Sequence, residues 1–269
     1  MERGVTPVLY TKEIAASYGK TRVLRGVSIG FRPGRLTALV GPNGCGKSTL
    51  LKAIMGFVPV DEGCVTLDGH PIQTIGRRAL ARRIAYLPQE SHCPDYLTLG
   101  ELIELSGYAR YSLLGGPTAR DRALFQTALT TVGLADLAHR RVNSLSGGQR
   151  QRAWVAMVLA QDADIVLMDE PVNHIDIKFQ YSVLAIIRDL TVARGKTVIA
   201  VLHDLNLTAA FADDVIMLRD GQVVAAGPVA DTLTAPVVAR VFDLEADIFQ
   251  REGRLVCLPR VATAQPAAP

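Results

Sequence analysis

The stretch that decides the fold is Gly41-Pro42-Asn43-Gly44-Cys45-Gly46-Lys47-Ser48, which matches the pattern G-x-x-x-x-G-K-[ST]. The apolar run 36–40 before it predicts a short strand, and a helix is expected to follow over 47–55. Glycines let the backbone curl so that successive N–H groups point inward, and the helix N-terminus adds its positive end. A glycine loop in this setting predicts a phosphate-binding site.

Within this loop, Lys47 would supply a positive charge to the β- and γ-phosphates of a nucleotide, and Ser48 would offer a hydroxyl to Mg²⁺. Cys45 is expected to be a small filler; the alternative is a reactive thiol, because a helix N-terminus lowers a thiol pKa. The residues expected to contact ATP here are Gly41, Pro42, Asn43, Gly44, Cys45, Gly46, Lys47, Ser48 and Thr49.

A second element is the apolar run 165–168, which predicts a strand and ends in Asp169 and Glu170. In sheets of this kind, ligands bind at the carboxyl ends of the strands. Asp169 would hold Mg²⁺ through water, and Glu170 would polarise an attacking water as general base. An apolar strand followed by two acids is weak evidence alone, but it becomes strong beside a phosphate loop.

A third element, Leu145-Ser146-Gly147-Gly148-Gln149, lies between the other two in the sequence. Ser146 and the amides of Gly147 and Gly148 would head a helix and suit a γ-phosphate. With this insert, the chain resembles the ATP-binding-cassette (ABC) ATPases over about residues 8 to 245. The resemblance implies ATP and Mg²⁺ as cofactors. It also implies a head-to-tail homodimer in which each signature motif, Gln149 included, caps the ATP of the partner.

The resemblance carries four further residues onto the nucleotide. Gln89 matches the Q-loop glutamine, which binds Mg²⁺ or water, and His203 resembles the switch histidine that contacts the γ-phosphate. Tyr18 matches the aromatic that stacks on adenine, and Asp176 matches the D-loop aspartate. Glu170, His203 and Gln89 are the expected catalytic set, and Ser48, Gln89 and Asp169 the expected Mg²⁺ set. Val172 departs from the family, which usually has a threonine there, so it receives no polar role.

The alternation of strands and helices predicts an α/β fold with a mostly parallel sheet. The expected architecture is a P-loop NTPase (RecA-like) core with an N-terminal antiparallel β-subdomain over 8–31 and an inserted helical signature subdomain. The core is expected over about 8–92 and 161–245, and the helical subdomain over about 93–160. Residues 246–269 are expected to form a C-terminal extension, with a disordered Ala- and Pro-rich tail over 262–269.

Composition narrows the class of protein. Apolar residues make up 49% of the 269, but the longest apolar run, 153–160, is far short of the ~18 residues that cross a bilayer. The N-terminus lacks the apolar centre of a signal peptide. The net charge of +3 is too weak to indicate nucleic acid, and the four scattered cysteines suit reduced thiols better than disulfides or zinc. A cytoplasmic protein resting against a membrane protein is expected.

Four stretches are similar to the ATPases of iron–siderophore, haem and vitamin B12 importers, and most of all to ferric siderophore importers: GPNGCGKSTLLKAI, ARRIAYLPQ, LTLGELIELSGYARY and NSLSGGQRQRAWVAMVLAQ. The resemblance implies a peripheral subunit on the cytoplasmic face of a bacterial inner membrane. Its partners would be membrane permeases and, indirectly, a substrate-binding protein. The permease is expected to dock on the patch that these residues mark, with ordinary core of the helical subdomain as the alternative for any single one of them: Tyr96, Leu97, Leu99, Tyr108 and Tyr111.

Two other functions remain as alternatives. A soluble ABC ATPase acting on nucleic acid or ribosomes usually carries two cassettes, long coiled coils or zinc motifs, and none is evident here. A nucleotide kinase or GTPase would share the phosphate loop but would leave the LSGGQ motif unexplained. Within the importer class, haem or vitamin B12 is the alternative substrate.

Overall fold

The computed structural model describes residues 8–112, 115–173 and 175–260. Its centre is a six-stranded sheet in the order β10-β9-β3-β8-β7-β6. β3 (Leu36–Val40), β6 (Ile84–Leu87), β7 (Ile165–Met168), β8 (Thr197–Val201) and β9 (Asp214–Arg219) run parallel, and β10 (Gln222–Pro228) is antiparallel at one edge. Every residue of β3, β7 and β8 is buried. This agrees with continuous apolar runs, which sheets covered on both faces require.

A second, antiparallel sheet has the order β2-β1-β4-β5. It consists of β1 (Leu9–Tyr18), β2 (Thr21–Phe31), β4 (Glu62–Leu67) and β5 (His70–Pro71). Its apolar face and one face of the central sheet enclose α1 (Lys47–Ile54), whose Leu50, Leu51 and Ile54 are buried. This hydrophobic core holds α1 in place. A helix after the phosphate loop was predicted from the sequence, and α1 is that helix.

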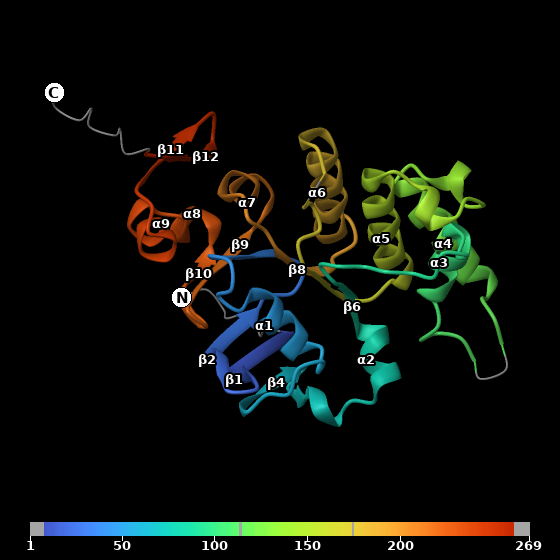
Figure 1. Cartoon of the computed structure of the whole chain (residues 1–269), viewed down its shortest axis with the longest axis horizontal. Coiled ribbons are helices and arrows are strands. Elements are labelled where there is room, and N and C mark those ends of the chain that lie inside the picture. The colour runs from blue at the N-terminus through green and yellow to red at the C-terminus, as the bar shows by residue number, and fades with distance from the viewer. Residues whose placement is uncertain (1–7, 113–114, 174, 261–269) are drawn as a thin grey trace.

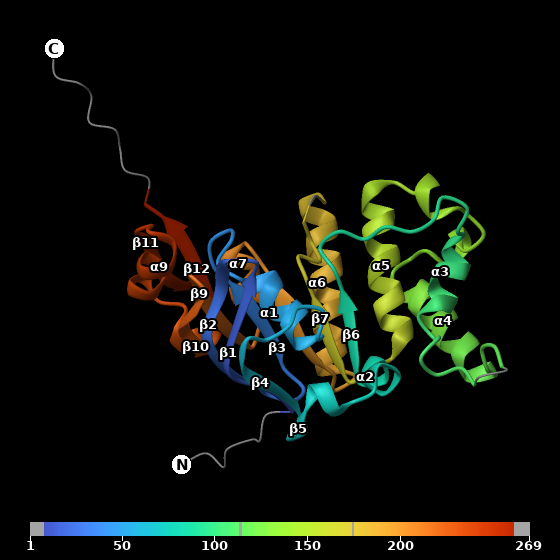
Figure 2. The same ribbon diagram turned by 60° about the horizontal axis from the view of Figure 1, so that its bottom comes forward.

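A cluster of helices connects β6 to β7 and lies at one end of the molecule (Figures 1 and 2). It contains α3 (Leu99–Leu105), α4 (Ala119–Thr131) and α5 (Gly147–Gln161), and α2 (Arg77–Arg83) precedes β6. α6 (Ile177–Val192) and α7 (Leu205–Phe211) follow β7 and β8. One continuous core joins this cluster, α6, α7 and the other face of the central sheet. The exact limits of the helical subdomain remain a prediction.

The C-terminal region forms ordered structure at the opposite end from the helical cluster (Figure 1). It contains α8 (Val229–Thr232), α9 (Ala235–Phe242) and a separate hairpin of β11 (Ala246–Arg251) and β12 (Arg254–Pro259). The predicted tail, 262–269, lies outside the described residues.

The architecture is the α/β fold predicted for a P-loop NTPase, with small differences at element ends. β3 and β7 match the predicted 36–40 and 165–168, and α1 ends at Ile54, one residue before the predicted end at 55. Over the described parts of the chain, no helix is both long and apolar enough to span a membrane.

Candidate nucleotide-binding site

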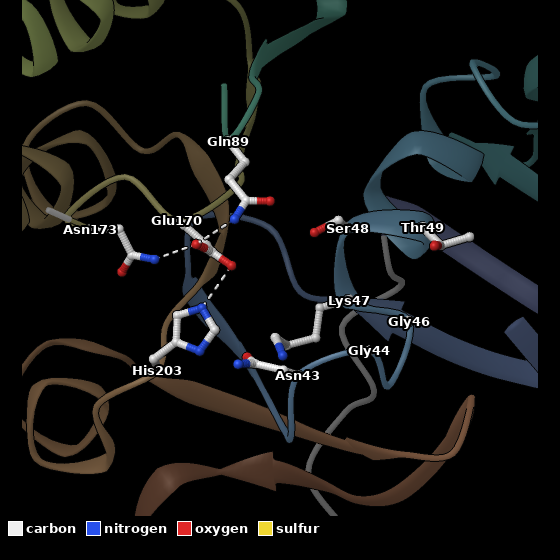
Figure 3. A pocket seen from close by; sticks show the side chains of 10 residues that line it. All are labelled: Asn43, Gly44, Gly46, Lys47, Ser48, Thr49, Gln89, Glu170, Asn173 and His203. Atoms are coloured by element: carbon white, nitrogen blue, oxygen red, sulfur yellow. Dashed lines mark hydrogen bonds and ion pairs between the residues drawn. The ribbon is translucent and has the colours of Figure 1, made fainter. Parts of the chain in front are cut away.

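A cavity of about 700 Å³ opens where the phosphate loop faces the carboxyl ends of β6, β7 and β8. Six residues of the phosphate loop and the start of α1 line one side of the cavity, and four polar side chains line the other (Figure 3). The lining residues are Asn43, Gly44, Gly46, Lys47, Ser48, Thr49, Gln89, Glu170, Asn173 and His203. Four segments that are far apart in the sequence therefore meet in one pocket.

The phosphate loop closes around the ammonium group of Lys47. Its Nζ donates to the carbonyl oxygens of Gly41 at 2.8 Å and Pro42 at 2.9 Å, and Lys47 is buried. The turn depends on Gly46, which has φ 104°, and where a Cβ would lie 2.8 Å from Leu24 Cδ2. Two backbone carbonyls of the loop therefore hold the Lys47 ammonium group within the loop, where its charge faces the pocket.

Asp169 and Ser48 form a site whose chemistry suits a divalent cation. Ser48 Oγ donates to Asp169 Oδ1 at 3.0 Å, while the buried Oδ2 has no hydrogen-bond partner. Asp169 is 1% exposed, and this burial raises its pKa despite the hydrogen bond from Ser48, which lowers it. A buried carboxylate oxygen without a partner, beside a hydroxyl, fits the oxygen ligands that Mg²⁺ prefers.

Glu170 is held by three side chains in an unusual backbone conformation. Gln89 Nε2 donates to Oε2 at 2.8 Å, His203 Nε2 lies 2.7 Å from Oε1, and Asn173 Nδ2 donates to Oε2 (Figure 3). The φ of Glu170 is 57°, in the left-handed region that a non-glycine residue rarely adopts. The structure brings the three predicted catalytic residues together around one carboxylate.

Asn173 is the lining residue that the sequence did not reveal. It follows Pro171 by two positions, and no spacing to another residue in the sequence indicates that it lines the pocket. The available signal was its place three residues after Glu170, because one turn of chain can bring such a pair into contact. Its side-chain amide donates to Oε2 of Glu170, the oxygen that also accepts from the side-chain amide of Gln89.

The signature motif opens α5 but does not belong to the described lining of this pocket. Ser146 Oγ accepts from the Gln149 amide N–H at 3.3 Å, and Gln149 Oε1 accepts from the Ser146 N–H at 3.0 Å. This reciprocal pair is a capping box, and it orders the first turn of α5. A smaller cavity of about 230 Å³ lies between Gln89 and Gly147. Gln89 therefore lines both cavities.

Three other predicted residues have these surroundings. Tyr18 ends β1, is half exposed and lies outside the described pocket lining. Asp176 caps α6, with Oδ1 accepting from the Phe179 N–H at 3.2 Å. Cys45 is 4% exposed, and burial raises the pKa of its thiol against the lowering effect of Lys47. This environment favours the small filler over the reactive thiol.

The sequence profile of the ABC transporter family matches residues 24–173, which is more than half of the chain. This chain belongs to the ABC transporter family. It is an ABC ATPase and binds ATP. It is 37% identical to the petrobactin import ATP-binding protein FpuD of Bacillus anthracis, with 93% of each chain covered. It is 38% identical to the ferric enterobactin transport ATP-binding protein FepC of Escherichia coli K12, with 88% of each covered.

Among solved structures, the ABC ATPase is similar to the dimeric structure of a bacterial ABC transporter cassette. The TM-score is 0.74 at 28% identity, over 82% of this chain and 98% of the other. The fold and the family assignment therefore agree.

Proposed function

We propose that this ABC ATPase powers a bacterial importer of ferric siderophores. The observation that carries the proposal is the similarity along nearly the whole chain to FpuD and FepC, whose names state petrobactin import and ferric enterobactin transport. The geometry contributes the motor, a phosphate loop that faces a held carboxylate.

In the proposed reaction, Glu170 accepts a proton from the water that attacks the γ-phosphate. Both carboxylate oxygens of Glu170 are occupied by Gln89, Asn173 and His203. One of these contacts would break so that the oxygen can accept from the attacking water. Lys47 leaves the loop carbonyls to contact the β- and γ-phosphates, and His203 turns to the γ-phosphate. Ser48, Gln89 and Asp169 would hold Mg²⁺, which when bound neutralises phosphate charge. Tyr18, exposed at the end of β1, would stack on adenine.

The signature motif would act on a second subunit. Ser146, Gly147 and Gly148 lie at the start of a helix whose N–H groups favour an anion, yet they do not line the pocket of their own chain. A head-to-tail homodimer supplies the anion, because each signature then meets the ATP of the partner. Gln149 orders the motif, and Asp176, at the start of α6, would contact the partner across the same interface.

The permease would dock on the helical cluster, with the protein peripheral to the cytoplasmic face of the inner membrane. Of the predicted patch, Tyr96 and Tyr108 are 72% and 75% exposed, and Leu105 beside them is also exposed. Leu99 belongs to the core instead, since it is fully buried. Aromatic side chains that extend from a rigid helical cluster suit the apolar contact with a permease helix.

The proposal is tested first by purifying the tagged chain from gently solubilised native membranes and identifying its partners by mass spectrometry. A polytopic permease, one copy per ATPase, is the expected result. Recovery of only soluble partners, with all of the protein in the cytosolic fraction, would contradict the importer function and favour the nucleic-acid alternative.

The substrate is tested in the host by uptake of ferric siderophore and haem labelled with radioactive iron and of vitamin B12 labelled with radioactive cobalt, with the gene deleted and then restored. Uptake of ferric siderophore should disappear on deletion and return with the parent gene, but not with Glu170→Gln. Unchanged siderophore uptake together with lost haem or vitamin B12 uptake would assign the other substrate.

A further inference from the structure

The backbone of the C-terminal hairpin makes a direct contact with a side chain of α7, the helix that follows His203. The Cys257 N–H donates to Asn206 Oδ1 at 2.8 Å, and Asn206 Nδ2 donates to the Cys257 carbonyl oxygen at 3.1 Å. The Asn206 amide thus pairs with β12 as a strand residue would, across 51 positions of sequence. α7 and the hairpin lie side by side in both ribbon views (Figures 1 and 2).

Asp204 links Asn206 to the pocket, because it is hydrogen-bonded to Asn206 and follows the pocket residue His203 in the chain. Asp204 Oδ1 accepts from the N–H groups of Asn206 at 2.7 Å and Leu207 at 3.0 Å, and so caps α7. His203 precedes Asp204 directly, and its Nε2 lies 2.7 Å from Glu170 Oε1. A continuous series of hydrogen bonds and peptide units therefore leads from β12 to the catalytic carboxylate.

The packing beneath these bonds makes the contact firm. Cys257 and Ala246 of the hairpin are buried in the main core, and Leu207 of α7 is buried in the same core. Asp204 lies close enough for its charge to add to the effect of burial, which raises the pKa of the Cys257 thiol. The buried face of the hairpin is thus directed at the first turn of α7.

α7 needs such support because it has only seven residues. Helices this short are unstable on their own, and their position depends on what they pack against. Besides the cap, the first turn of α7 is fixed by the Asn206 pair and by buried Thr208, whose hydroxyl donates to the Asp204 carbonyl at 2.9 Å. Removal of the Asn206 pair leaves the cap and the core in place but frees the direction of the turn that carries His203.

We propose that Asn206 is a positioning residue, and that the C-terminal hairpin acts through it to hold His203 in place for ATP hydrolysis. This inference rests on the proposed role of His203. It gives the C-terminal extension a part in the ATPase reaction, although it lies at the end of the molecule remote from the signature helix.

The test compares Asn206→Ala with parent protein in steady-state ATPase assays, with thermal unfolding followed in parallel. The expected result is a kcat about 5- to 10-fold lower, with KM for ATP within about twofold, since displacement of a catalytic group affects the chemical step and not uniform binding. Asn206→Asp keeps the acceptor for the Cys257 N–H but sets a carboxylate oxygen against the Cys257 carbonyl oxygen where Nδ2 donated, so its kcat should be no higher than that of Asn206→Ala. Leu258→Ser, on the outward and exposed side of the hairpin, is the matched control and should equal the parent.

A double-mutant cycle separates positioning from a general structural effect. In a His203→Ala background, Asn206→Ala should lower kcat no further, because its effect passes through His203. An undiminished additional loss, or a parent-like kcat for Asn206→Ala, would overturn the proposal. If His203→Ala itself hydrolysed ATP like the parent, the role of His203 would fail first, and the cycle shows which of the two has failed.

Discussion

Glu170 is the residue whose surroundings bear most directly on the reaction. Its carboxylate is 10% exposed and accepts from three side chains. Glu170→Gln retains the shape but cannot accept a proton, so ATP should still bind while turnover falls at least ~10²-fold, the usual effect of losing a general base. Equilibrium binding and steady-state hydrolysis measure the two quantities separately.

The control for this variant is Glu104→Gln on the exposed side of α3, which should hydrolyse ATP like the parent. Turnover of Glu170→Gln near the parent value would show that another group accepts the proton.

Asp169 leads to a prediction about pH. Burial raises its pKa, and a bound cation requires the ionised carboxylate, so protons compete with Mg²⁺. The affinity for Mg–ATP should therefore weaken as pH falls toward this raised pKa, and the loss should begin at a higher pH than for an ordinary aspartate. Titration calorimetry at several pH values, with and without Mg²⁺, measures the effect.

Asp169→Asn is the comparison, because it carries no titrating group at this position and should lose the benefit of Mg²⁺ at every pH. An affinity of the parent for Mg–ATP that rose on acidification would be the opposite of this expectation.

At the scale of single residues, the sequence predicted the pocket well where a motif has fixed spacing. Gly46, Lys47 and Ser48 line the pocket because one loop contains them. Asn173 was missed because its contact with Glu170 depends on the left-handed φ of Glu170, which no pattern of residue types encodes. Leu99 is core, which was the alternative for each member of the docking patch, since apolar spacing does not by itself show which face of a helix is covered.

Among the elements, α4 contains a buried acid that hydrogen bonds keep ionised. Burial opposes ionisation of Asp121, but hydrogen bonds from Thr118 and Arg110 lower its pKa to about 2. A lowered folded-state pKa stabilises the protein above the unfolded value of about 3.9, and this stabilisation is lost as pH falls through about 2. Asp121→Asn should lower the free energy of unfolding by on the order of 2 kcal/mol near neutral pH.

The difference between Asp121→Asn and the parent should shrink as pH falls from about 4 to about 2 in denaturant titrations. Exposed Asp136→Asn is the control and should leave stability nearly unchanged. A difference that stayed constant over this pH range would argue that Asp121 contributes by packing alone.

The elements that the sequence predicted best are the buried strands that lead into the site. β7 matches the predicted 165–168, because four apolar residues end at two acids. The β11–β12 hairpin could not be predicted in the same way. Its turn places Glu252 at φ 51° before Gly253, and its exposed strands show only weak alternation, so tertiary contact with α7 decides its structure.

For the whole molecule, the signature motif predicts dimerisation by ATP. Glu170→Gln, which retains ATP, should change from the 29.0 kDa monomer to a dimer when ATP is added, but not when ADP is added. Adding Ser146→Arg should abolish the dimer, since a large side chain would occupy the place of the partner's phosphate. Light scattering after gel filtration gives both masses.

Loss of the helix cap at Ser146 is a second effect of that substitution. Thr118→Arg removes an equivalent capping box from α4 and is the matched control, so it should still dimerise. If both variants fail to dimerise, instability of the caps and not the nucleotide contact is the cause.

The helical cluster is inserted in a single connection of the central sheet, the one from β6 to β7. The two strands are parallel neighbours in the sheet, so the whole helical cluster is one enlarged crossover between them. α5, which packs on β6, is the helix that any such crossover needs, and everything from 88 to 146 precedes it as added length. One connection between two adjacent strands therefore carries the whole surface that would recognise a second copy, while the order of the central sheet does not depend on it.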